Sequence, residues 1–76
     1  MHKQEFLIEG LIQDVVFDII QNEKMDWDEA MKMFYQSETF EKLCDTETGM
    51  YLESSAYIYE LFKDEIKYGK FGHFAA

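Results

Sequence analysis

Apolar residues recur at steps of three and four through the first third of the chain, the spacing of one face of an α-helix. That face carries Ile8, Leu11, Ile12, Val15, Val16, Ile19 and Ile20. The pattern predicts a long first helix over about residues 4–22. At about 100° per residue, Phe17 falls on the opposite face together with Asp14 and Asp18. We therefore treat Phe17 as a candidate contact with a partner.

The segment MDWDEAMKMFYQ predicts a second helix over 26–36, because Asp26 can cap the free backbone N–H groups of its first turn. The expected inward stripe consists of Trp27, Ala30, Met31 and Phe34. After it, Ser37 can cap a short helical turn near 38–44. The alternative is that the second helix continues through this segment with a kink.

The stretch DTETG, from Asp45 to Gly49, has the composition of a turn. The Asp45 side chain can bond its own downstream backbone, and glycine permits a positive φ angle. The residues that follow, MYLESS, are either an extended bridge or the first turn of the last helix.

A last helix is predicted over 54–68, with either Ser54 or Ser55 as its N-cap. Gly69 follows the last periodic residue, as glycine often does at helix ends. Residues 69–76 contain two glycines and no periodicity, and we expect them to form a tail.

Tyrosines are concentrated in this last third of the chain. Tyr57 and Tyr59 are two positions apart on the predicted helix, so their side chains point about 200° from one another. One of them faces the core and the other faces solvent or a partner. Tyrosine is enriched at protein interfaces, so Tyr51, Tyr57 and Tyr59 are also candidate partner contacts.

These patterns together predict an all-α fold, a single domain (1–76) built as a compact bundle of three main helices plus a short helical turn. A domain of this size buries only about 60% of the surface that its unfolded chain exposes. Small cores usually need a disulfide, a metal or another subunit. Cys44 is the only cysteine and cannot form an intrachain disulfide. Association with a second copy as a homodimer, or with another protein, is the support that stays open.

The net charge of −9 comes from sixteen acids against seven lysines. Such a field repels polyanions, so we expect no direct binding to nucleic acid or to an acidic membrane, whereas a basic protein partner fits its sign. The sequence contains no apolar run long enough for a membrane span or a signal peptide. With its single cysteine, this predicts a cytoplasmic protein.

Catalytic and metal-binding patterns are not evident, and we expect neither an enzyme nor a cofactor. Metal sites need several ligands at defined spacing, but His2, Cys44 and His73 are isolated from one another. Ser54 and Ser55 lack a nearby base that would activate a hydroxyl, and helix capping explains them better.

Twelve residues of the C-terminal half resemble small uncharacterised bacterial helical proteins of accessory or antitoxin-like type, which are encoded beside toxin-type genes. They are Phe40, Leu43, Asp45, Thr48, Gly49, Tyr51, Ser54, Ser55, Tyr57, Ile58, Tyr59 and Leu61. The resemblance implies a bacterial cytosolic origin and a protein-binding role, such as neutralising a basic toxin-like partner. It supplies no catalytic residues. The alternative function is a small-molecule binding domain with an aromatic pocket lined by Tyr51, Tyr57 and Trp27.

Overall fold

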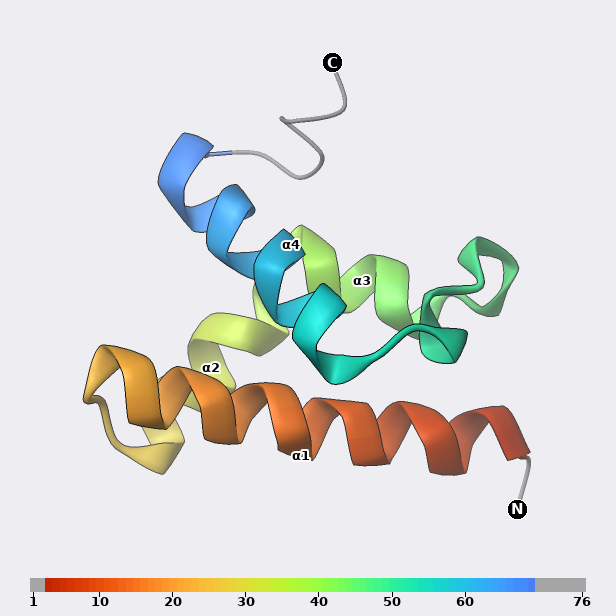
Figure 1. Cartoon of the computed structure of the whole chain (residues 1–76), viewed down its shortest axis with the longest axis horizontal. Coiled ribbons are helices and arrows are strands. Elements are labelled where there is room, and N and C mark those ends of the chain that lie inside the picture. Colours follow the sequence, from red (N-terminus) through yellow and green to blue (C-terminus); the bar gives the residue numbers. More distant parts are fainter. Residues whose placement is uncertain (1–2, 70–76) are drawn as a thin grey trace.

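The computed structural model describes residues 3–69, which form helices and short 3₁₀ turns and contain no strand (Figure 1). The elements are α1 (Lys3–Glu23), α2 (Trp27–Tyr35), α3 (Glu38–Cys44), the 3₁₀ turns η1 (Thr46–Thr48) and η2 (Met50–Leu52), and α4 (Ser55–Tyr68). The predicted all-α bundle is therefore confirmed, and the short turn near 38–44 is a separate helix. Apart from Gly69, the predicted tail lies outside the described residues.

The longest helix, α1, runs along one side of the molecule, and the other elements pack against it (Figure 1). It contacts α4, α2 and η2, while α3 lies against α4, α2 and η2. The shortest dimension of the fold is 18 Å, which is about two helices thick. Each helix therefore keeps one face open to solvent.

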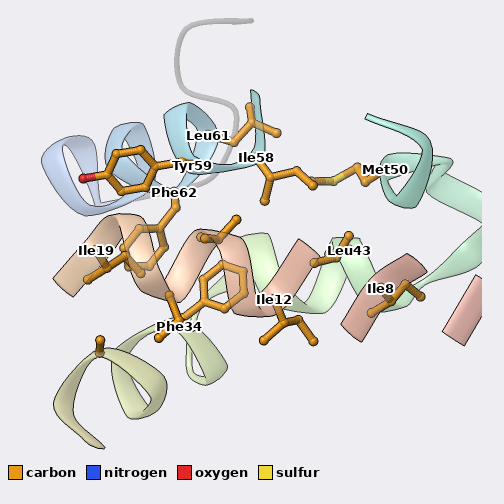
Figure 2. Packing of buried hydrophobic residues seen from close by; sticks show 13 residues of the cluster. Ile8, Ile12, Ile19, Phe34, Leu43, Met50, Ile58, Tyr59, Leu61 and Phe62 are labelled. Atoms are coloured by element: carbon orange, nitrogen blue, oxygen red, sulfur yellow. The ribbon is translucent and has the colours of Figure 1, made fainter. Parts of the chain in front are cut away.

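The core forms where the apolar face of α1 meets the other helices. Figure 2 shows Ile19 of α1 near the rings of Phe34 from α2 and Phe62 from α4. The Phe34 ring lies edge-on to Phe62 at 5.4 Å and to Phe40 at 5.7 Å between centroids, a favourable aromatic geometry. The buried apolar residues are Ile8, Ile12, Val15, Val16, Ile19, Ala30, Phe34, Leu43, Met50, Ile58, Tyr59, Leu61 and Phe62.

One residue of the predicted inward stripe is misplaced. Ala30 and Phe34 are buried and Met31 is half-buried, but Trp27 is 48% exposed. Trp27 is the first residue of α2, and helical side chains lean toward the N-terminus of their helix. Its indole stays at the surface, where it lines a cavity with Met31 and Tyr35.

Local capping signals fix where the helices begin. The side chains of Asp26, Ser37 and Ser54 accept hydrogen bonds from the backbone N–H three residues later, at 2.9, 3.0 and 3.1 Å. Of the two serines proposed as caps of the last helix, Ser54 is the one that performs this role. Each cap satisfies a backbone donor that the helix itself leaves unpaired.

The DTETG segment is a turn, as predicted. Asp45 Oδ1 accepts a hydrogen bond from Glu47 N at 3.0 Å, and Gly49 has a φ of +73° that a side chain would strain. The Thr48 hydroxyl donates to the backbone oxygen of Lys42 at 2.6 Å, which holds the turn against the end of α3. The next residues form η2, which is neither an extended bridge nor part of α4.

A carboxylate on α4 holds the N-terminus of α3. Glu65 Oε2 accepts a hydrogen bond from Glu38 N at 2.8 Å, and Glu65 Oε1 accepts from Thr39 N at 2.9 Å and from Thr39 Oγ1 at 2.7 Å. A negative charge is favourable at a helix N-terminus because the backbone donors there are unpaired. Thr39 is fully buried, so Glu65 also satisfies a hydroxyl that has no access to water.

We expect Glu65→Ala to lower the free energy of unfolding by about 1–3 kcal/mol, because buried donors lose their acceptor. Glu60→Ala is the control on the same helix. Glu60 makes an exposed ion pair with Lys63, and such pairs contribute about 1 kcal/mol or less. Urea unfolding followed by circular dichroism measures both variants. Equal losses would show that Glu65 is an ordinary surface acid.

Candidate functional site

The main surface feature is a groove of about 610 Å³ between the N-terminal half of α1 and η2. Its apolar lining consists of Phe6, Leu7, Leu11, Tyr51 and Leu52. Leu52 is 70% exposed and Phe6 is 64% exposed, the highest values among the large apolar side chains of the described residues. Within residues 3–69, the two least covered large apolar side chains therefore share one groove.

The groove exists because α1 is longer than the helices that pack on it. α1 has 21 residues, whereas α2 has 9, α3 has 7 and α4 has 14. Residues 15, 16 and 19 are fully buried, while Phe6 and Leu7 one or two turns from the N-terminus remain exposed. Among the described residues, the three-residue turn η2 lies against this end and covers it incompletely.

The polar lining of the groove is acidic. Glu9 and Asp14 come from α1, and Glu53 follows η2 on the other side, so both walls carry a carboxylate. Gln13 adds a neutral amide, and no lysine among the described residues lines the groove. With a net charge of −9 behind it, the groove attracts cations and repels anions.

Gly10 lies among these residues, in the interior of α1. A Cβ atom built on it would meet no heavy atom within 4 Å, so no packing within the chain requires glycine here. Its φ is also ordinary for a helix, unlike that of Gly49. Glycine inside a helix is nonetheless less favourable than alanine by about 0.5–1 kcal/mol.

The four candidate contacts are dispersed over the fold. Tyr51 is half-buried and lines the groove, whereas Phe17 is 53% exposed on α1, about one turn beyond the groove residue Asp14 and outside the groove lining. Tyr59 is buried beneath Lys63, whose ammonium lies 4.9 Å from the ring centroid, so Tyr59 has no surface to offer a partner. Tyr57 is the tyrosine that faces solvent. The structure therefore decides which of Tyr57 and Tyr59 faces the core, which the sequence leaves open.

Sequence reasoning did not single out Phe6, Leu7 or Leu52. Phe6 and Leu7 precede the regular apolar stripe, and Leu52 lies in a segment without helical spacing. One pattern in the sequence could have indicated this surface. Leu7 and Leu11 are four positions apart and therefore neighbours on one helix face, and Gly10 lies between them in the sequence.

The three aromatic residues considered for a small-molecule pocket do not line a common cavity. Tyr51 belongs to the groove, while Trp27 lines a separate cavity of about 290 Å³ with Met31 and Tyr35. Tyr57 lies on the exposed side of α4. The aromatic pocket expected from the sequence is not assembled by these residues.

No group of three His, Cys, Asp or Glu side chains within residues 3–69 could hold a metal ion. Cys44 is at the surface, and partial burial of its thiol raises the pKa above the ordinary value, so the group stays protonated at neutral pH. Over the same range, none of the helices combines the length and apolar character needed to cross a membrane.

Comparison with protein-family models, curated proteins and solved structures finds no match. The class of protein is therefore defined by its own structure: a small all-α bundle with an open apolar groove and acidic walls.

We expect Gly10→Ala to raise the free energy of unfolding by about 0.5–1 kcal/mol, because alanine favours the helix and meets no obstacle. Gly49→Ala is the matched control. Its Cβ would also meet nothing, but its φ of +73° makes alanine unfavourable by about 1–2 kcal/mol. Thermal and urea unfolding should therefore show a more stable Gly10→Ala variant and a less stable Gly49→Ala variant. A destabilised Gly10→Ala variant would show that the fold itself needs glycine at this position.

Proposed function

We propose that this chain is a small acidic protein-interaction module that binds a basic partner protein through the groove between α1 and η2. The observation that carries this proposal is that the most exposed apolar side chains, Phe6 and Leu52, share a groove with three carboxylates. A cytoplasmic, antitoxin-like role in neutralising a toxin-like partner is the form of this function that the resemblance of the C-terminal half favours.

The composition of the groove resembles that of a protein interface. Such interfaces have an apolar centre that supplies most of the affinity and a polar rim that supplies orientation and specificity. Here Phe6, Leu52 and half-buried Tyr51 can provide the centre. The carboxylates of the walls can attract a cationic partner and raise its rate of association.

Charge favours a different protein over a second copy of this chain. Closed dimers usually bring the same surface of both subunits together. In a dimer through the groove, Glu9, Asp14 and Glu53 would meet the same acids of the other copy, with no lysine lining either groove. Like charges at an interface are unfavourable, and a basic partner removes this cost.

The first test removes the negative charges that line the groove. A variant combining Glu9→Gln, Asp14→Asn and Glu53→Gln should bind the partner about tenfold more weakly, because each rim charge contributes a few tenths to about 1 kcal/mol. The partner is first identified by cross-linking in the native host, then purified and titrated by calorimetry at two salt concentrations. We expect the affinity of the wild-type chain to fall with salt more steeply than that of the variant.

The control makes the same change of net charge elsewhere, with Asp28→Asn, Glu41→Gln and Glu47→Gln, all exposed and outside the groove lining. It should retain affinity close to that of the wild type. Equal weakening by both variants would show that affinity depends on net charge alone. It would contradict binding through the groove. An acidic partner, or a monomer that cross-links to nothing, would contradict the function itself.

A second test compares apolar side chains. Phe6→Ala and Leu52→Ala should each weaken the complex by about 2 kcal/mol, or about thirtyfold, as expected for buried anchors. Phe17→Ala and Tyr57→Ala remove exposed rings outside the groove lining and should change affinity much less. Unfolding curves check that all four variants keep their stability. A larger loss for Phe17→Ala would place the interface further along α1, toward its C-terminal end and outside the groove.

A further inference from the structure

We infer that the groove receives a basic amphipathic helix of the partner, and that the backbone of this helix crosses α1 at Gly10. This inference rests on the proposed function, since it specifies what occupies the same groove.

The position of Gly10 is the first reason. It lines the groove with the apolar residues Leu7 and Leu11 on either side of it along α1. No atom of residues 3–69 occupies the space that its Cβ would fill, and the helix would be more stable with alanine. A glycine allows another backbone to approach closely. The space at Gly10 is therefore available to a partner and has no use within the isolated chain.

The second reason concerns the shape of the occupant. An extended peptide usually binds by adding a strand to the edge of a sheet, which satisfies its backbone hydrogen bonds. The described part of this chain has no strand and thus no such edge. A helix satisfies its own backbone hydrogen bonds and can place an apolar face into a groove.

The distribution of charge is the third reason. Carboxylates stand on both walls, Glu9 and Asp14 on α1 and Glu53 beyond η2, and the apolar lining comes from the same two segments. An amphipathic helix that carries lysine or arginine on both borders of its apolar stripe matches this order. A helix with acidic borders would meet like charges on each side.

The test uses two synthetic peptides of identical leucine and lysine composition, each about 18 residues or five helical turns long. One repeats leucine at helical spacing and the other alternates leucine with lysine, which is the period of a strand. We expect the helical peptide to bind the wild-type chain at least tenfold more tightly. Its binding should shift backbone NMR signals of residues 6–14 and 51–53 more than those of the rest of the chain.

The decisive variant is Gly10→Leu, which fills the groove floor without meeting any atom of the chain at its Cβ. It should reduce affinity for the helical peptide at least tenfold, with a smaller reduction for Gly10→Ala. Gln21→Leu is the control, because it adds the same side chain to an exposed position of α1 eleven residues away. That variant should bind as the wild type does. Unfolding curves confirm that each variant is folded.

Several outcomes would overturn the inference. Tight binding that is insensitive to Gly10→Leu would show that the helix lies elsewhere, and equal affinity for both peptides would show that no helix is selected. Sedimentation that reveals a dimer disrupted by Gly10→Leu would assign the groove to a second copy. Absence of binding by either peptide would also contradict the inference. The proposed function would survive the first two results if the native complex still depends on the groove carboxylates.

Discussion

The packing of α2, α4 and η2 on one apolar stripe of α1 is the constraint that organises this protein. Val15, Val16 and Ile19 are fully buried, and α2 and α4 contact this helix directly. None of the packed helices matches the length of α1, so Phe6 and Leu7 near its N-terminus remain exposed, although Ile8 and Ile12 of the stripe are buried. The groove at the N-terminal part is therefore a consequence of unequal helix lengths. A two-layer fold of this size has no further element with which to cover it.

The acidic residues of the chain perform two different tasks. Glu65 acts inside the fold, where its carboxylate accepts hydrogen bonds from Glu38 and Thr39 and joins α4 to α3. A helix of seven residues is unstable in isolation, so α3 depends on such tertiary support. Glu9 and Asp14, in contrast, lie on the exposed surface of α1 and line the groove. Some of the acids behind the net charge of −9 therefore stabilise the fold. Only their positions in the structure distinguish them from the acids that line the groove.

Features that depend on neighbours in sequence could be predicted, and features that depend on tertiary contacts could not. The caps at Asp26, Ser37 and Ser54 and the turn at Gly49 are local chemistry, and they bound the helices to within about a residue of the prediction. The Glu65 link spans 26 and 27 residues, so no local pattern reveals it. The sequence showed that Tyr57 and Tyr59 must diverge. Only the position of α1 against α4 decides that Tyr59 is the buried one.

A sequence that specifies one structure usually makes local choices that agree with the fold, and departures from this rule concentrate at functional sites. Three departures lie in the groove: glycine inside a helix, and two large apolar side chains exposed to water at Phe6 and Leu52. Each is unfavourable, or at best neutral, for the isolated chain. All three become favourable when an apolar surface covers them, because Phe6 and Leu52 are then removed from water and the space at Gly10 is filled. Their coincidence in one place is accounted for by the partner that we propose for this groove, which would cover all three.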